Sequence, residues 1–266
     1  MSKVGYINNQ VSNKPTVIVP DIHGRPLFVS QVFDNYPTDV WDIVFLGDIL
    51  HTEGTQKRWL DIEREFLRSN LFGEEMAKEI NASFDALKLI LEKQENCPDS
   101  VFLLRGNHDD IKGSFVGPYG KYTRTGESSL FYYGLKQLRF DLYADYDVYE
   151  KTIPYLYIGR DFLCSHSVPT DVFTLDEVIL NNRTTHVNFT WTDNVSQQGK
   201  WTRNFSKNCT NLGPENMNYW FIGHRPCDPD KLVRKQMNGR LIQCNHPKRH
   251  VVLELQPDCP FKAVVL

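Results

Sequence analysis

The chain has 266 residues, of which 41% are hydrophobic and 24% are charged, a composition that excludes disordered and fibrous proteins and suits a globular one. Lys and Arg number 30 against 33 for Asp and Glu, so the net charge of -3 provides no whole-chain attraction to nucleic acid or to an anionic membrane. The six Cys residues contain no C-x-x-C pair, which is the usual spacing of a thiolate zinc site.

The first residues lack the apolar core of a secretory signal, and no run approaches the ~20 apolar residues that span a membrane. We therefore expect a cytoplasmic protein that makes no contact with a membrane. The charge balance also leads us to expect no nucleic-acid partner.

Three apolar runs in the first half predict buried strands. These runs are Thr16–Val19, Asp42–Leu46 and Ser100–Leu104. Between the last two, apolar residues at spacings of three and four predict a helix over about 74–94, and a second helix is expected over about 57–67. Together they form a helical insertion at about 55–96, and the alternation of buried strands with helices favours an α/β fold.

The second half is richer in predicted strands, and it contains one long polar segment. Residues 155–158 and 161–165 are separated by a Gly-Arg turn and predict a hairpin. The segment 181–218 is rich in Asn and Thr and predicts a long loop. Because the sequence shows neither a repeat nor a linker, we expect the whole chain, 1–266, to be a single domain. Further strands are expected at 219–222, 241–244 and 250–255, the last two as a pair.

Side chains that can bind a metal follow five of these runs, and the carboxyl ends of strands are where α/β folds gather their functional groups. Mixed Asp, Asn and His ligands suit a divalent metal such as Mn, Fe or Zn. A carboxylate can also bridge two ions held ~3.5–4 Å apart, and such a pair stabilises an in-line displacement at phosphorus. The residues are Asp21, His23, Asp48, Asn107, His108, Asp109, His166 and His224.

The order of these motifs, D-x-H-G, G-D, G-N-H-D, S-H and G-H-x-P, resembles the calcineurin-like metallophosphoesterase superfamily from Asp21 to Pro226. The R-G-N-H of Arg105–His108 and the F-T-W-T-D of Phe189–Asp193 are similar to motifs of its phosphoprotein-phosphatase branch. That branch includes bacterial and phage serine/threonine phosphatases and diadenosine tetraphosphatase-like enzymes. The resemblance implies a four-layer α/β/β/α sandwich of two mixed β-sheets flanked by helices.

The resemblance also implies a role for each residue in the hydrolysis of phosphate monoesters. Asp48 would bridge two divalent ions, with Mn expected first and Fe, Zn or Ni as alternatives, and a metal-bridging hydroxide would attack phosphorus directly. His108 would be the general acid, and Asp109 would hold a ligand His or its loop. Asn107 would face the substrate as well as a metal. The metal ligands would be Asp21, His23 and Asp48 for one ion, and Asp48, Asn107, His166 and His224 for the other.

The second motif departs from the family pattern G-D-x-V-D-R-G. His51 replaces the Asp that supports the general acid, and Thr52 replaces the Arg that binds phosphate. We expect His51 either to support His108 or to touch the substrate. Another cation must then bind the phosphate, because a bidentate Arg is a main source of phosphate affinity. The candidates are Arg25, Arg203 and Arg225.

Three other functions compete with a phosphomonoesterase. A hydrolase of dinucleoside polyphosphates would use Arg and Trp side chains of the 181–218 segment for phosphates and bases. A nuclease would favour a basic groove, which the charge balance does not support. A binding module with a vestigial metal site would have lost ligands, yet all are present. We therefore expect a phosphorylated protein, nucleotide or small molecule as the partner.

Overall fold

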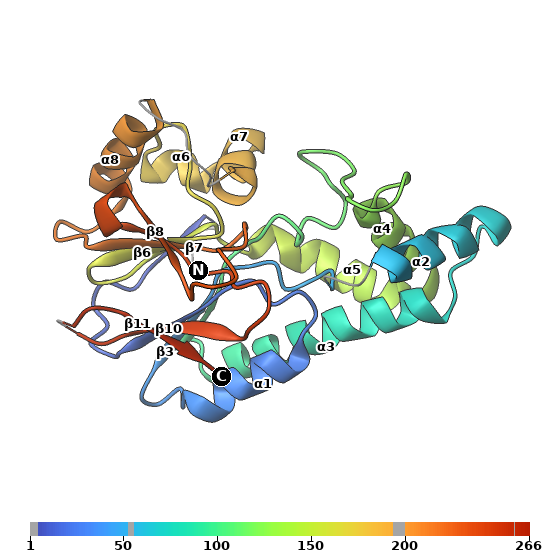
Figure 1. Ribbon diagram of the computed structural model, residues 1–266, viewed down its shortest axis with the longest axis horizontal. Coiled ribbons are helices and arrows are strands. Elements are labelled where there is room, and N and C mark those ends of the chain that lie inside the picture. The colour runs from blue at the N-terminus through green and yellow to red at the C-terminus, as the bar shows by residue number, and fades with distance from the viewer. Residues whose placement is uncertain (1–4, 53–55, 194–199, 258) are drawn as a thin grey trace.

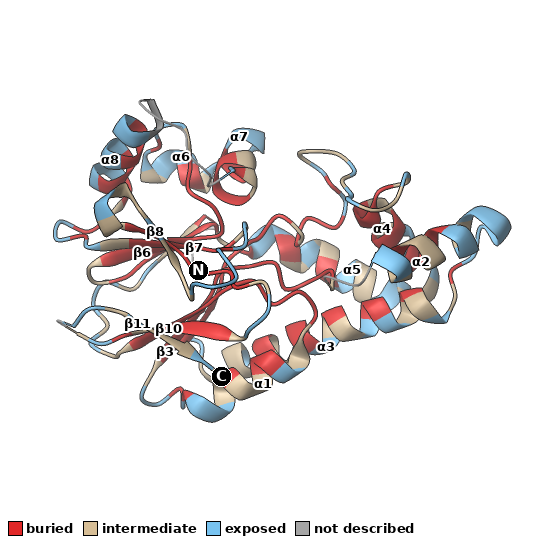
Figure 2. Ribbon diagram, viewed as in Figure 1, coloured by how far each residue is buried: buried red, intermediate tan, exposed pale blue. Residues whose placement is uncertain are grey.

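The computed structural model describes residues 5–52, 56–193, 200–257 and 259–266. In this part of the chain, two mixed β-sheets pack face to face, and helices cover both outer faces (Figure 1). Figure 2 shows that the buried residues concentrate in the sheets and on the inward faces of the helices. The four-layer α/β/β/α sandwich implied by the sequence resemblance is therefore confirmed.

The first sheet contains the three strands predicted in the first half of the chain. Strands β2, β3 and β4 are parallel neighbours, and β10 and β11 extend the sheet antiparallel beyond β2. Val17 and Val19 of β2 face the helices, whereas Ile18 packs against the second sheet, so β2 is buried on both sides. The strands are β2 (Thr16–Val19), β3 (Asp42–Phe45), β4 (Val101–Leu103), β10 (Val251–Leu255) and β11 (Lys262–Val265).

The second sheet has the strand order β1-β5-β6-β7-β9-β8. Strands β5 and β6 form the predicted hairpin, and β6, β7 and β9 are parallel neighbours. Tyr157, Cys164 and Phe221 of this sheet pack against the first sheet and form the central core. The strands are β1 (Tyr6–Asn8), β5 (Leu156–Ile158), β6 (Phe162–Ser165), β7 (Tyr219–Ile222), β8 (Arg234–Gln236) and β9 (Leu241–Gln243).

The expectation that 241–244 and 250–255 pair with each other is wrong. Strand β9 pairs with β7 and β8, whereas β10 pairs with β2 and β11 in the other sheet. The chain crosses between the sheets here, and Asn245 hydrogen-bonds Asp21 at the crossing. Two apolar runs close in sequence indicate strands, but they do not indicate which sheet each one joins.

The outer face of the first sheet is covered by helices that include the predicted insertion. Helices α2 and α3 confirm the helices expected at about 57–67 and 74–94. Met76 and Ile80 of α3 pack into the same core as Val17 of β2. Figure 1 shows α2, α4 and α5 extending sideways beyond the sheets. The helices are α1 (Pro26–Asn35), α2 (Gln56–Ser69), α3 (Glu74–Asn96), α4 (Glu127–Leu138), α5 (Phe140–Tyr149) and the 3-10 turn η1 (Glu150–Thr152).

The segment 181–218, expected to be a long loop, contributes helices to the cover of the second sheet. Phe205 of α8 packs against this sheet, but Asn204 and Asn208 on the same side hide its amphipathic pattern. Their side chains are buried because they donate to the carbonyls of Thr170 and Asp171 at 2.7 and 2.8 Å. The helices are α6 (Leu175–Ile179), α7 (Arg183–His186), the π-turn η2 (Val187–Trp191), α8 (Lys200–Leu212) and the 3-10 turn η3 (Met237–Gly239).

Candidate metal and catalytic site

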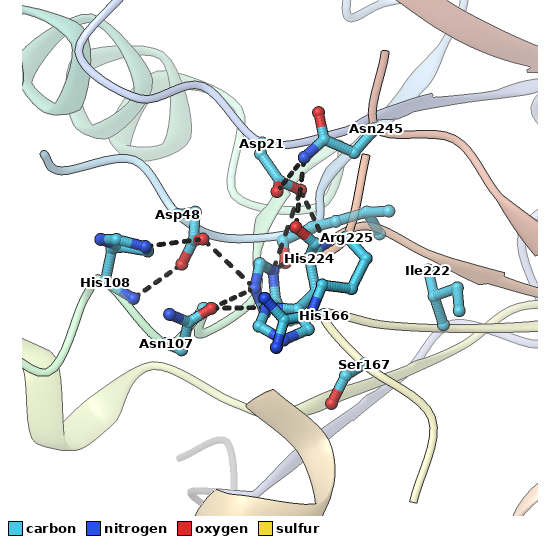
Figure 3. Close-up of polar contacts among 12 residues, drawn as sticks. Asp21, Asp48, Asn107, His108, His166, Ser167, Ile222, His224, Arg225 and Asn245 are labelled. Atoms are coloured by element: carbon cyan, nitrogen blue, oxygen red, sulfur yellow. Dashed lines mark hydrogen bonds and ion pairs between the residues drawn. The ribbon is translucent and has the colours of Figure 1, made fainter. Parts of the chain in front are cut away.

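The structure brings the predicted ligands together where the two sheets meet. Asp21, Asp48 and Asn107 follow β2, β3 and β4, so they lie at the carboxyl end of the first sheet. His166 and His224 follow β6 and β7, parallel neighbours in the second sheet. Figure 3 shows these five side chains gathered around one centre.

The first group of ligand atoms comes from Asp21, His23 and Asp48. His23 Nε2 lies 3.9 Å from Asp21 Oδ2 and 3.8 Å from Asp48 Oδ2. His23 Nδ1 hydrogen-bonds the carbonyl oxygen of His51 at 2.9 Å, which directs Nε2 towards the carboxylates. All three ligand residues are buried, and they offer one ligand atom each within 4.8 Å of one another.

The second group shares Asp48 with the first. Asp48 Oδ2 lies 3.3 Å from His166 Nε2. Asn107 Oδ1 lies 2.9 Å from the same nitrogen and 2.8 Å from His224 Nδ1 (Figure 3). His166 Nδ1 is 3.0 Å from the carbonyl oxygen of Leu46, so this nitrogen binds the backbone and Nε2 faces the site. Asp48 is thus the one carboxylate common to both groups.

This donor set fits divalent ions better than a network of hydrogen bonds. Several distances between imidazole nitrogens and carboxylate oxygens, 3.8 to 4.0 Å, are too long for a hydrogen bond. Burial raises the pKa of Asp21 to about 6. Burial alone would lower the pKa of His166, yet the Asp48 and Asp21 carboxylates raise it to about 9. The two buried carboxylates thus stabilise positive charge between them, as Mn, Fe or Zn would supply.

The backbone of the site is strained and closely packed. Left-handed φ angles are costly for non-glycine residues, and they cluster at functional sites. The loops that carry Gly47 and Gly106 touch backbone to backbone, so a Cβ on either residue would collide with the other loop. The residues with left-handed φ are His23 (47°), Asp48 (50°), His51 (59°) and His224 (63°).

Asp109 holds together the loops that carry Asp48 and Gly106. Its Oδ2 accepts hydrogen bonds from the main-chain N–H groups of Asp48 and Gly106, both at 2.8 Å. Its Oδ1 accepts from those of Ile49 and Leu50 at 2.9 and 3.3 Å. The carboxylate therefore fixes the turn that positions Asp48.

Asn245 is a site residue that sequence reasoning missed. Its Nδ2 donates to Asp21 Oδ2 at 2.6 Å and to the carbonyl oxygen of His224 at 3.3 Å (Figure 3). It therefore orients a carboxylate of the first ligand group and links it to the second sheet. The signal was available, because Asn245 follows a predicted strand just as the ligands do.

His108 is a partly exposed imidazole beside the ligand groups. Its side chain is 30% exposed, and its Nε2 lies 4.0 Å from Asp48 Oδ2. Its main-chain N–H donates to Asp48 Oδ1 at 2.7 Å, which ties the residue to the ligand group. Burial lowers the pKa of His108 to about 4, although the Asp48 carboxylate opposes this shift. Its Nδ1 has no hydrogen-bond partner in the described part of the chain.

His51 occupies the position where the family pattern has Asp. Its ring packs on Phe131 with centroids 4.4 Å apart, and it lies 5.3 Å from the ring of His108. Neither ring nitrogen has a hydrogen-bond partner among the residues described. Burial holds the pKa of His51 well below its usual range, so the ring is neutral. Its expected roles, supporting His108 or touching the substrate, stay predictions.

Thr52, which stands where the family has an Arg, faces a buried carboxylate. Its main-chain N–H donates to Glu79 Oε1 at 2.6 Å, and its hydroxyl donates to the same side chain. Arg58 of α2 reaches this pair, with a guanidinium nitrogen 3.5 Å from both Glu79 Oε2 and Thr52 Oγ1. Sequence patterns did not predict this network, because Thr52, Arg58 and Glu79 come from three separate segments.

The three arginines expected to bind phosphate have different surroundings. The Arg25 guanidinium donates to the carbonyl oxygens of Asp21 and Ile22 at 2.6 and 2.7 Å, and so supports the first ligand loop. Arg203 is exposed on α8. Arg225 is about half exposed, and its Nε lies 3.6 Å from Asp193 Oδ1. The charge of Arg225 helps to lower the pKa of both His108 and His224, after burial and other neighbours. Arg225 is therefore electrostatically coupled to the site.

Comparison with known proteins agrees with this geometry. The family model of the calcineurin-like phosphoesterases matches residues 14–228. No protein with a curated description matches the chain. The chain belongs to the calcineurin-like phosphoesterase family, which is dinuclear and metal-dependent, and it is a hydrolase of phosphoric esters.

Several solved structures share the fold at low sequence identity. A protein serine/threonine phosphatase from Saccharomyces cerevisiae superposes with a TM-score of 0.64 at 15% identity, covering 98% of this chain and 82% of that one. A cold-active protein-tyrosine phosphatase from a Shewanella species gives 0.58 at 14% identity, with the same coverage. A proposed diadenosine tetraphosphatase gives 0.54 at 14% identity, covering 98% of both chains.

None of the helices in the described ranges combines the length and the apolar composition needed to cross a lipid bilayer.

Proposed function

We propose that the chain hydrolyses phosphate monoesters with the help of two divalent ions, Mn being the first choice. The observation that supports this proposal is that two ligand groups share one carboxylate, Asp48, beside the partly exposed imidazole of His108. His108 is partly exposed, so a phosphate ester can approach the ligand groups beside it.

Each residue then has a defined task. Asp21, His23 and Asp48 would hold one ion, and Asp48, Asn107, His166 and His224 would hold the other. Bound ions of this kind neutralise phosphoryl charge and lower the pKa of a water so that it can attack near neutral pH.

His108 supplies the proton for the leaving oxygen from Nε2, the nitrogen that faces Asp48. Its low pKa keeps it neutral in the resting site. The negative charge of an arriving phosphate favours the protonated imidazole, because an opposite charge within ~4–6 Å raises the pKa of His. His108 would therefore be protonated, and able to act as the acid, only when substrate is bound.

Arg225 is the cation best placed to attract the phosphate. It is exposed, it follows the ligand His224 directly, and its charge reaches both His224 and His108. Its partner Asp193 belongs to the F-T-W-T-D segment, and the two side chains are exposed and 3.6 Å apart. An exposed pair of this kind is weak and can open towards a dianion.

A dinucleoside polyphosphate hydrolase is the second candidate, because one structure of similar fold is a proposed diadenosine tetraphosphatase. Such a substrate carries several phosphates and needs several cations. Arg25 is bound to backbone carbonyls and Arg203 lies on α8, so the surroundings favour a single phosphate.

The test is hydrolysis of p-nitrophenyl phosphate, phosphoserine and diadenosine tetraphosphate with Mn, Zn, Ni or Mg added in turn. We expect metal-dependent turnover of the monoesters and little turnover of the tetraphosphate. His108→Asn should lose most of its rate on phosphoserine, whose leaving group needs a proton, and less on p-nitrophenyl phosphate. Arg225→Ala should raise KM, whereas Arg68→Ala, a matched change of an exposed Arg on α2, should not. Absence of metal-dependent turnover on every ester would reject the proposal.

A further inference from the structure

Two aromatic rings stand beside the proposed acid. The ring of Tyr119 is perpendicular to that of His108, with centroids 5.0 Å apart. The ring of Trp191 packs on Tyr119 at 4.9 Å and lies 6.2 Å from the ring of His224. The sequence did not single out Tyr119, which precedes α4 in a segment without strand or helix periodicity. Tyr119 and Trp191 thus form an aromatic wall between the acid and a metal ligand.

The position of Tyr119 is fixed by the start of α4. Its main-chain N–H donates to Ser128 Oγ at 2.8 Å, and that hydroxyl donates back to the carbonyl oxygen of Tyr119 at 3.0 Å. The Glu127 carboxylate accepts hydrogen bonds from three consecutive main-chain N–H groups, those of residues 121–123. These hydrogen bonds fix the loop and therefore hold the ring of Tyr119 in place.

The wall also carries polar atoms without partners. The Tyr119 hydroxyl and Trp191 Nε1 are shielded from solvent, and neither has a hydrogen-bond partner within the described ranges. A buried donor without an acceptor is destabilising, and native structures seldom retain one without a functional reason. The two rings that carry these donors lie beside His108 and His224, where a substrate would bind.

We propose that the aromatic wall is the leaving-group subsite and selects aryl phosphates, of which phosphotyrosine is the protein-derived example. This inference rests on the proposed function. Water adds to phosphorus, and the bond from phosphorus to the aryl oxygen breaks. The proton from His108 Nε2 goes to that oxygen, and the proton released by the water restores protonated His108, which gives a phenol and inorganic phosphate. The group on the leaving oxygen must therefore lie beside His108, where Tyr119 stands.

The short distance between the rings of Tyr119 and His108 determines which aromatic substrates can contact Tyr119. A ring bonded directly to the leaving oxygen can contact Tyr119, because aromatic pairs interact at centroid separations of 4.5–7 Å. In a nucleotide, the ribose separates the base from the scissile phosphate and carries the base out of this range. The serine of a phosphoserine offers no ring at all. The wall should therefore favour phosphotyrosine over both.

The experiment measures kcat/KM of the Mn-loaded enzyme for phosphotyrosine, phosphoserine and diadenosine tetraphosphate. Each variant is compared with the wild type on the same substrate, so intrinsic differences between leaving groups cancel. We expect Tyr119→Ala and Trp191→Ala to lose about tenfold on phosphotyrosine but less than about twofold on the other two substrates. Tyr119→Phe should keep most of the preference for phosphotyrosine, because the ring remains. Tyr133→Ala, an exposed Tyr on α4, is the matched control and should change nothing.

Thermal unfolding checks that each variant is folded, and Tyr119→Leu replaces the alanine variant if that one is not. Equal losses on phosphotyrosine and phosphoserine, or no loss on phosphotyrosine, would overturn the inference while leaving the proposed function intact. A loss confined to diadenosine tetraphosphate would also overturn it. A wild-type protein without activity on any ester would reject the proposed function itself.

Discussion

Replacement of Asp109 by Asn should destabilise the loops of the candidate metal site while every proposed metal-binding side chain is kept. The Asp109 carboxylate accepts four main-chain hydrogen bonds, two on each oxygen. An Asn side chain keeps one oxygen and turns an NH2 group towards the other two donors. Two buried N–H groups then lose their acceptor, at about 1–3 kcal/mol each. Burial raises the pKa of Asp109, so removal of its charge recovers part of that cost.

We therefore expect Asp109→Asn to lower the free energy of unfolding by about 2–4 kcal/mol. Urea unfolding in the presence of a chelator measures this loss without a contribution from metal binding. Asp85→Asn, a matched change on the exposed side of α3, should stay within about 0.5 kcal/mol of the wild type. A loss below about 1 kcal/mol for Asp109→Asn would refute the role assigned to its four hydrogen bonds.

Three further predictions concern other parts of the chain. Burial raises the pKa of Glu150 to about 7 from 4.5, so the folded protein keeps a proton there that the unfolded chain has lost. The unfolding free energy should then fall by up to about 3 kcal/mol as pH rises through that window, and urea titrations at pH 5 and pH 8 should show a flatter dependence for Glu150→Gln. Asn245→Ala removes the 2.6 Å hydrogen bond to Asp21 and should weaken Mn binding about 10- to 100-fold by calorimetry; unchanged affinity would contradict this. Gly106→Ala places a Cβ against the main chain of Asp48 and should lower the melting temperature by several degrees, whereas an unchanged value would show that the loops can part.

The ligand set could be predicted from the sequence because each ligand directly follows a buried apolar run. A run such as Thr16–Val19 predicts a strand on composition alone, and parallel strands bring their carboxyl ends to one edge. The turn residues Asp21 and Asp48 are then neighbours whatever the details of packing. Local signals therefore sufficed to predict which residues meet at the candidate metal site.

What the sequence could not show depends on contacts between distant segments. Strands β9 and β10 are separated by a few residues but belong to different sheets. Neither apolar run indicates which strand it pairs with. Helix α8 looked like a loop because Asn208, which would ordinarily face water, is buried against the carbonyl of Asp171. Periodicity identifies apolar faces, and it fails where the buried face is polar and satisfied by the backbone.

The two departures from the family pattern at the second motif are coupled to their surroundings. Thr52 is held by Glu79, a fully buried carboxylate on α3, and Arg58 of α2 approaches the same group. We expect an Arg at position 52 to form an ion pair with Glu79. That pair would neutralise the guanidinium charge, which would then be less available to a phosphate. His51, likewise, fits a ring-lined space beside Phe131 that a smaller Asp would leave partly empty. We therefore expect that restoring the family motif in this chain requires changes in α2 and α3 as well, because Arg58 and Glu79 of these helices contact Thr52.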